Sequence, residues 1–244
     1  MTKHVEVLPN KAELIERSRE LVVAKVQAAI AERGRCTIAL AGGSTPKPLY
    51  ELLAKAAIDW ERLHVFWGDE RYVPADHPDS NEGMARKAWL DQVPFPAANI
   101  HPIQTNTADP EVAANQHDQA LRTFFAVQPG EFPQLDVILL GMGDDGHTAS
   151  LFPHTEALKV RDRLVTVGNK DGQPRLTFTA PLINAARTVI FIVAGANKRP
   201  ALRGVFAETG DAELYPSRLI QPAGELWWLL DADAGAEIGV ATPS

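Results

Sequence analysis

Hydrophobic and polar residues are arranged in alternating blocks along this chain of 244 residues. Short apolar runs, which suit strands, are followed by longer stretches in which apolar residues recur at helical spacing. The run Leu135–Leu140 is too continuously apolar for a half-exposed strand, so it predicts a central strand covered on both faces. The other strong strand candidates are Cys36–Ala41, Leu63–Trp67 and Thr188–Ala194.

Helices are predicted between these strands. In the segment Lys11–Ala31, apolar residues fall near helical spacing, so we expect an amphipathic helix with its polar face toward solvent. Alternating strands and helices are typical of helices packed on a mostly parallel sheet. The sequence therefore predicts an α/β fold, an open, mostly parallel twisted sheet with helices on both faces. Further helices are predicted at Pro46–Ala57, Asn81–Asp91, Glu111–Val127 and Lys198–Glu208, and shorter strands at Arg163–Val167, Arg175–Ala180 and Leu226–Leu230.

Composition narrows the possible roles. A hydrophobic content of 45% and the lack of linkers or repeats favour a single domain over residues 1–244, with a frayed end at Gly235–Ser244. The net charge of −7 argues against nucleic-acid or anionic-membrane partners, so any anion site must be built locally. No signal peptide or membrane span is recognisable, and a cytoplasmic location is expected. The single cysteine, Cys36, excludes an intrachain disulfide and a cysteine-rich metal site.

The loop Gly42–Pro46 follows the predicted strand Cys36–Ala41. Ligands of open α/β sheets bind beyond the carboxyl ends of the strands. Glycine N–H groups and two hydroxyls at the start of a helix suit a phosphate or a carboxylate. The alternative is that Ser44 or Thr45 only caps the helix. The spacing matches neither a Walker A loop nor GxGxxG, so neither ATP nor a dinucleotide is indicated.

Charged side chains follow two other predicted strands. Asp69, Glu70 and Arg71 come after Leu63–Trp67, where Arg71 could hold an oxyanion or pair with either acid. Lys198 falls in the first turn of a predicted helix, where the helix dipole disfavours a cation unless an anion lies nearby. A lysine that simply faces solvent is the alternative. Arg175, at the start of a short segment, could supply another cation.

The segment Gly141–Pro153 is the strongest candidate for catalysis. Its glycines allow a sharp turn directly after a buried strand, and it carries Asp144, Asp145 and His147. The alternative is a turn whose aspartates bind their own backbone and whose Thr148 caps a helix. The histidines lack metal-ligand spacing and no serine lies in a GxSxG elbow, so neither a metal nor a serine nucleophile is indicated. The remaining hypothesis is that His147, close to Asp145, activates water as a general base.

Several motifs resemble bacterial 6-phosphogluconolactonases of the DevB type, in order and over nearly the whole chain. They are AGGSTPKPLYELL, FWGDERYVPADHPDSN and DVILLGMGDDGHTASLFP, together with the segment Arg175–Pro181 and the stretch GANKR. The first and third are shared with glucosamine-6-phosphate deaminases and ribose-5-phosphate isomerases, which have a similar fold. Phe152 stands where the deaminases carry an acid, and Arg71 ends a triplet that is DEY-like in them. These two positions favour the lactonases.

The resemblance implies hydrolysis of 6-phospho-D-glucono-1,5-lactone to 6-phospho-D-gluconate, in the oxidative pentose phosphate pathway or the Entner–Doudoroff route, without metal or cofactor. His147 would take a proton from water, Asp145 would orient His147, and Arg71 would steady the substrate or the oxyanion. The implied partner is a small phosphorylated sugar lactone, with no nucleic acid or membrane, and the protein would be a monomer or small homo-oligomer. The expected substrate- and phosphate-binding residues are Gly43, Ser44, Thr45, Asp69, Arg175 and Lys198.

Two other functions remain open from the sequence. A deaminase or isomerase of sugar phosphates could use the same loop, although Phe152 and Arg71 disfavour it. A non-catalytic sugar-phosphate sensor is the second, because effector domains of some bacterial repressors resemble this fold. Such sensors normally carry a helix-turn-helix extension, and no basic module is expected before Cys36. Trp227 and Trp228 are expected to pack in the core rather than at a subunit contact.

Overall fold

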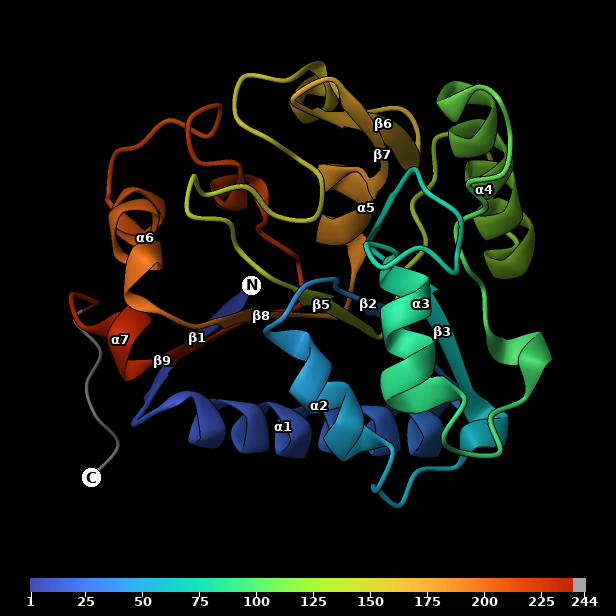
Figure 1. Ribbon diagram of the computed structural model, residues 1–244, viewed down its shortest axis with the longest axis horizontal. Helices are drawn as coiled ribbons and strands as arrows, with labels where there is room; N and C mark the ends of the chain where they lie inside the picture. The colour runs from blue at the N-terminus through green and yellow to red at the C-terminus, as the bar shows by residue number, and fades with distance from the viewer. Residues whose placement is uncertain (239–244) are drawn as a thin grey trace.

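A twisted sheet of six strands forms the centre of the computed structural model, which describes residues 1–238 (Figure 1). All its neighbouring strands run parallel. The central strands are fully buried, as their continuous apolar sequences require. The predicted α/β fold with a mostly parallel sheet is therefore confirmed. In spatial order the strands are β1 (Thr2–Leu8), β9 (Glu225–Asp231), β8 (Thr188–Val193), β5 (Val137–Leu140), β2 (Cys36–Leu40) and β3 (Leu63–Trp67).

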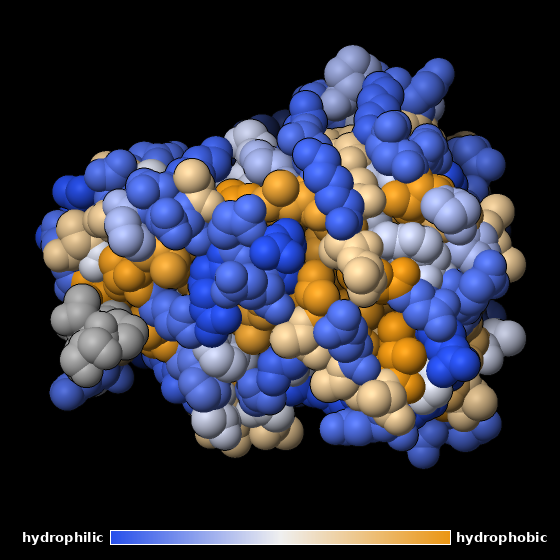
Figure 2. All heavy atoms as spheres, turned by 90° about the horizontal axis from the view of Figure 1, so that it is seen from below, coloured by the Kyte–Doolittle hydropathy of each residue, from blue (hydrophilic) through white to orange (hydrophobic). Residues whose placement is uncertain are grey.

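Helices cover both faces of this sheet. In Figure 1, α1 (Lys11–Arg33) runs beneath the sheet, and α5 (Ala180–Ala185) lies above it. The Asn10 side chain caps α1 by accepting the Glu13 N–H at 3.0 Å, and the helix ends at Gly34, whose φ is 77°. The face seen from below carries many hydrophilic side chains, with apolar patches exposed between them (Figure 2). The other helices are α2 (Pro46–Leu53), α3 (Asn81–Ala85), α4 (Pro110–Phe125), α5 (Ala180–Ala185), α6 (Arg199–Phe206) and α7 (Ala232–Gly235).

Several helix boundaries differ from the predicted ones. The helix predicted at Asn81–Asp91 is α3 followed by a π-helical turn, and α2 ends four residues early. Lys198 precedes α6 at its N-cap position instead of lying inside its first turn. No helix among residues 1–238 is long and apolar enough to cross a membrane. The π-helical turn is Arg86–Leu90, and the 3₁₀ turns are Trp60–Arg62, Ala97–Asn99, Glu156–Lys159, Ala196–Lys198 and Pro216–Leu219.

A second, antiparallel sheet begins directly after the carboxyl end of β3. Its spatial order is β4 (Asp69–Arg71), β7 (Gln173–Phe178) and β6 (Val165–Lys170). Asp171 and Gly172 close the β6–β7 hairpin with φ values of 52° and 83°, the positive values that a tight hairpin turn requires. The strands predicted at Arg163–Val167 and Arg175–Ala180 are each shifted by two or three residues from β6 and β7. The outer half of the hairpin is largely exposed and carries no hydrophobic pattern that could mark the strand ends.

The first strand, β1, was not predicted. It pairs with β9 alone, at the edge of the sheet, and its residues are exposed or only partly buried, so its sequence is mixed and charged. His4 of β1 stacks on Trp227 at 3.9 Å between ring centroids, whereas Trp228 is buried against Phe191 at 3.8 Å. The core placement expected for the tryptophans is confirmed for Trp228, while Trp227 remains partly exposed under β1. Of the predicted frayed end, residues 239–244 lie outside the described residues.

Two histidines, His101 and His117, are kept neutral by burial. His101 stacks on Phe66 and lies 3.1 Å from His64, measured from its Nε2 to the His64 Nδ1. Burial, with a smaller contribution from His64, lowers the pKa of His101 to about 4. Burial likewise lowers the pKa of His117, on α4, to about 4. Both rings therefore stay neutral at pH values at which an unfolded histidine would be charged.

We expect the free energy of unfolding to fall as the pH decreases from about 6.5 toward 4. In this window the unfolded chain binds protons that the folded chain does not, so protonation favours unfolding. Urea denaturation across the window measures the slope. His117→Phe keeps a ring but cannot titrate, so its slope should be shallower than that of the wild type. His154→Asn, at an exposed loop position, is the control; equal slopes in His117→Phe and the wild type would contradict the assignment.

Candidate active site

A cavity of about 260 Å³ opens at the carboxyl ends of β2, β5 and β8. Its walls come from the loop before α2, the start of β4, the loop after β5 and the turn before α6. The four strand ends singled out in the sequence therefore do meet at one place. All predicted site residues except Asp145 line the cavity: Gly43, Ser44, Thr45, Asp69, Arg71, His147, Arg175 and Lys198.

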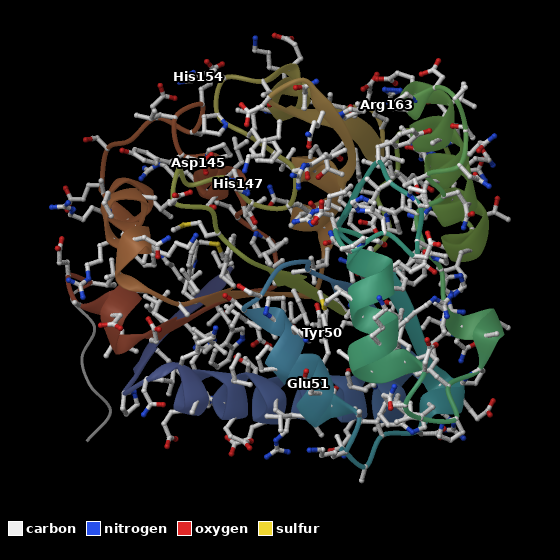
Figure 3. The ribbon with its side chains drawn as sticks, viewed as in Figure 1. Tyr50, Glu51, Asp145, His147, His154 and Arg163 are labelled. Carbon is white, nitrogen blue, oxygen red and sulfur yellow. The ribbon has the colours of Figure 1, made fainter. Side chains whose placement is uncertain are left out.

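Asp145 and His147 form a hydrogen-bonded pair on the loop after β5 (Figure 3). The His147 Nδ1 lies 2.6 Å from the Asp145 Oδ1, and the same oxygen accepts the His147 backbone N–H at 3.0 Å. Partial burial raises the pKa of Asp145, but the hydrogen bonds from His147 outweigh it and lower this pKa to about 2. An ionised carboxylate at this position keeps a proton on Nδ1 and leaves Nε2 as the basic nitrogen.

Two glycines make the turn that carries this pair. The Gly143 N–H donates to the His147 carbonyl at 2.9 Å, and the Gly146 N–H donates to the Gly143 carbonyl at 3.1 Å. Gly146 has a φ of 81°, which side chains rarely tolerate. A Cβ on Gly143 would overlap His147 Nδ1 and Asp145 Oδ1. Only glycine at position 143 therefore lets the pair close over the backbone, and the predicted sharp turn is confirmed.

The residues after His147 do not begin a helix. Thr148 Oγ1 donates to the Gly141 carbonyl at 2.9 Å, and the next helical turn starts at Glu156. The alternative in which Thr148 caps a helix is therefore wrong, although Asp145 does bind backbone of its own loop. Phe152 is 5% exposed and packs on the His147 imidazole, with ring centroids 4.4 Å apart. An apolar ring thus contacts the imidazole whose other partner is a carboxylate.

Arg71 and Arg175 lie opposite each other in the β4–β7 pair. Arg71 donates through Nη1 to the Asp79 carbonyl at 2.7 Å, and the Nε atoms of both arginines are buried without a hydrogen-bond partner in the structure. Burial, and then the charge of Arg71, lower the pKa of Arg175. Two like charges held side by side with unsatisfied N–H groups form a site that an anion would stabilise.

Glu70 does not pair with the guanidinium of Arg71, nor does Asp69, within the described part of the chain. Glu70 is 2% exposed, and its carboxylate accepts the backbone N–H groups of Arg71, Asn81 and Glu82, each at 2.8 Å. Burial raises its pKa, while these bonds act in the opposite direction. The local ion pair considered as an alternative is therefore wrong, because Glu70 is committed to the start of α3.

Asp69 is buried and joins two parts of the site. Its Oδ2 accepts the hydroxyl of Ser150 at 2.6 Å, and its backbone carbonyl accepts the Asn81 amide at 2.9 Å. The Asn81 amide fills the space beside Gly42, where a Cβ would overlap it. Sequence reasoning missed the roles of Ser150 and Asn81: both stand in motifs that carry the resemblance, but nothing in those motifs indicates a partner so distant in the chain.

The start of α2 presents hydroxyls that are not used by the helix. Thr45 occupies the N-cap position but makes no side-chain capping bond, and Gly43 has a φ of 101°. The capping role considered for Thr45 is thus wrong, and Pro46 begins the helix as predicted. Lys198 lines the cavity rather than only facing solvent. Within residues 1–238, no group of three or more His, Cys, Asp or Glu side chains is arranged to hold a metal ion.

Relatives of known name match almost the full chain. A 6-phosphogluconolactonase from Nostoc sp. is 66% identical over 240 residues, which cover 98% of this chain and 100% of the relative. The crystal structure of a devB protein superposes with a TM-score of 0.85 at 34% identity, covering 98% of this chain and 100% of that chain. A 6-phosphogluconolactonase structure from Trypanosoma cruzi gives a TM-score of 0.88 at 30% identity, covering 98% and 99%.

The family model described as glucosamine-6-phosphate isomerases/6-phosphogluconolactonase matches residues 9–228. This range contains the cavity and the loops that build it. The match agrees with the resemblance that the motifs indicated. The chain therefore belongs to the glucosamine-6-phosphate isomerase/6-phosphogluconolactonase family.

Proposed function

We propose that this chain is a 6-phosphogluconolactonase, hydrolysing 6-phospho-D-glucono-1,5-lactone to 6-phospho-D-gluconate, and that His147 is its general base. One observation carries the proposed roles: His147, held by Asp145, lines the same cavity as Arg71 and Arg175, whose Nε groups have no hydrogen-bond partner among residues 1–238. A basic nitrogen beside fixed cations suits the attack of water on a carbonyl of an anionic substrate. The names of relatives that cover nearly the full chain support the same reaction.

The chemistry needs an oriented water and stabilisation of developing charge, because a lactone carbonyl is already electrophilic. The His147 Nε2 accepts a proton from water as the water oxygen bonds to C1. The resulting imidazolium donates that proton to the ring oxygen as the bond between C1 and the ring oxygen breaks. His147 returns to its starting state, and the product carries a carboxylic acid that ionises in water.

Asp145 supports His147 in both steps. Its pKa of about 2 means that the carboxylate is charged throughout the neutral range. The negative charge holds the Nδ1 proton in place and stabilises the imidazolium when it forms. Phe152, which packs on the ring of His147, adds no second carboxylate, so Asp145 is the carboxylate that orients the imidazole.

The cations and the loop before α2 bind the phosphorylated sugar. We place the 6-phosphate at Arg175, Lys198 and the loop Gly43–Thr45, where the Thr45 hydroxyl is not engaged in capping. Arg71, next to Arg175, steadies the developing oxyanion or the lactone ring. Asp69, held by Ser150, accepts a hydrogen bond from a sugar hydroxyl. Binding at the phosphate end then orients C1 toward His147.

Replacing His147 by Gln should lower kcat/KM for the lactone by about 10²–10⁴-fold, the usual contribution of a general base. The lactone is generated in situ from glucose 6-phosphate, and its disappearance is corrected for spontaneous hydrolysis, with EDTA present. His154→Asn, at an exposed position, should retain wild-type activity. Unchanged kcat/KM in His147→Gln would remove His147 from the mechanism, and no acceleration by the folded wild type would reject the lactonase.

Replacing Lys198 by Ala should raise KM by about ten- to a hundredfold with a smaller change in kcat, because a phosphate contact is made equally in the ground state and the transition state. That range corresponds to about 1.5–3 kcal/mol for one charge-assisted hydrogen bond. Arg19→Gln on α1, away from the cavity, is the matched loss of one cation. Similar KM values in Lys198→Ala and Arg19→Gln would remove Lys198 from the phosphate site.

Glucosamine 6-phosphate should not release ammonia with this protein. A deaminase mechanism would place an acid where Phe152 contacts His147, and Phe152 can neither donate nor accept a proton. A coupled assay for ammonia, at the same enzyme concentration as the lactonase assay, provides the comparison. Ammonia release at a rate comparable to lactone hydrolysis would assign the site to the deaminase instead.

A further inference from the structure

The chain between α6 and β9 packs, from outside the cavity, on the loop after β5 that carries Asp145 and His147, which we call the catalytic loop. We refer to residues 211–220 as the clamp segment. It contains the 3₁₀ turn Pro216–Leu219, and its Glu213 carbonyl accepts the N–H of His154 at 3.1 Å. Ser217, which is 1% exposed, also contacts this loop. None of these clamp residues lines the cavity, so this contact is separate from substrate binding.

Ser217 makes two hydrogen bonds to one carbonyl. Its backbone N–H donates to the Gly146 carbonyl at 3.0 Å, and its Oγ donates to the same oxygen at 2.9 Å. This carbonyl belongs to the peptide that joins Gly146 to His147. The N–H of the same peptide donates to Asp145 Oδ1 at 3.0 Å. A chain of hydrogen bonds therefore runs from Ser217 through one peptide group to the carboxylate that holds the imidazole.

The clamp segment is itself anchored on α6. Arg218 Nη1 donates to the carbonyls of Gly204, Val205 and Ala207 at 2.7, 2.9 and 2.8 Å, at the carboxyl end of that helix. The Tyr215 ring fills the space beside Gly204, where a Cβ would overlap it, and also contacts the position of a Cβ on Gly146. The segment is thus wedged between α6 and the catalytic turn, which fixes where Ser217 meets Gly146.

We propose that Ser217 is a positioning residue for the reaction, acting through the Gly146–His147 peptide on the His147–Asp145 pair. Gly146 has no side chain that could fix the orientation of its peptide, and its φ of 81° is one that other residues rarely adopt. Two donors on the Gly146 carbonyl hold that orientation and polarise the peptide, which strengthens its N–H as a donor to Asp145. The inference rests on the proposed role of His147 as general base.

Ser217→Ala removes the hydroxyl bond and leaves the backbone bond. Its kcat for lactone hydrolysis should fall about fivefold with KM nearly unchanged, the effect of losing about 1 kcal/mol from one neutral hydrogen bond. Ser18→Ala is the matched control, because Ser18 is also buried and donates its hydroxyl to a backbone carbonyl, that of Leu14 at 2.7 Å. Ser18 lies in α1, so its loss should affect stability alone. Equal kcat values in Ser217→Ala and the wild type would overturn the proposal.

Two readouts separate positioning from a general loss of structure. Proton NMR should show the Nδ1 proton between His147 and Asp145 downfield in the wild type and moved upfield in Ser217→Ala. The acid limb of the kcat/KM profile should shift to lower pH, because a displaced Asp145 stabilises the imidazolium less. Added to His147→Gln, Ser217→Ala should cause no further loss, since residues that act as a unit are not additive. An unmoved proton signal and pH profile would overturn the proposal.

Gly204→Ala provides a second test that leaves Ser217 itself intact. The added methyl would displace the Tyr215 ring and with it the clamp segment. The Nδ1 proton signal is expected to move upfield in this variant too. If Ser217→Ala does not fold, Gly204→Ala decides the question, and an unmoved Nδ1 signal in it would contradict the proposal. A wild-type protein without lactonase activity would reject the proposed function, whereas the NMR comparison would still decide whether Ser217 controls the His147–Asp145 pair.

Discussion

The common direction of the six strands is the constraint on which the site depends. Because β2, β5 and β8 run parallel, their carboxyl ends lie at one edge of the sheet, and the loops that follow them meet there. Gly43, His147 and Lys198, far apart in the chain, therefore line one cavity. An antiparallel strand at any of these places would deliver its loop to the opposite edge. Sheet direction thus decides which residues can react together.

The charge of the cavity depends on where the neighbouring acids are used. Glu70 precedes Arg71 in the chain, yet its carboxylate is buried and satisfied by backbone N–H groups at the start of α3. Asp69 accepts the hydroxyl of Ser150 and likewise forms no ion pair with Arg71 in the described part of the chain. If either acid bound Arg71, the guanidinium would be neutralised as a local ion pair. Because neither acid pairs with Arg71, the Nε groups of Arg71 and Arg175 have no hydrogen-bond partner among the described residues. The fold therefore keeps two guanidinium charges available to bind an anion.

Hydrophobic pattern predicted the elements whose burial is complete and failed where burial is partial. Strands β2, β5 and β8 are buried along their whole length, so their sequences are continuously apolar. The edge strand β1 and the tip of the β6–β7 hairpin are half exposed and carry no such pattern. At the site, the strand-end rule brought His147, Arg71 and Lys198 together correctly. The Ser150–Asp69 and Ser217–Gly146 bonds depend on side-chain geometry across long separations, which spacing in the sequence does not encode.

In the proposed reaction, Asp145 links the activation of His147 to the release of the product. In the proposed reaction the lactone becomes a carboxylate, so the product carries one more negative charge than the substrate, at the end that faces His147. Cations in the cavity attract this product more strongly than the substrate, which by itself would slow release. Asp145, with a pKa of about 2, is ionised on the Nδ1 side of the imidazole, outside the cavity lining, and its charge repels the new carboxylate across the ring. The net charge of −7 acts in the same direction at longer range, where salt screens it. In the proposed reaction, the acid that keeps Nε2 basic therefore also weakens the binding of the product.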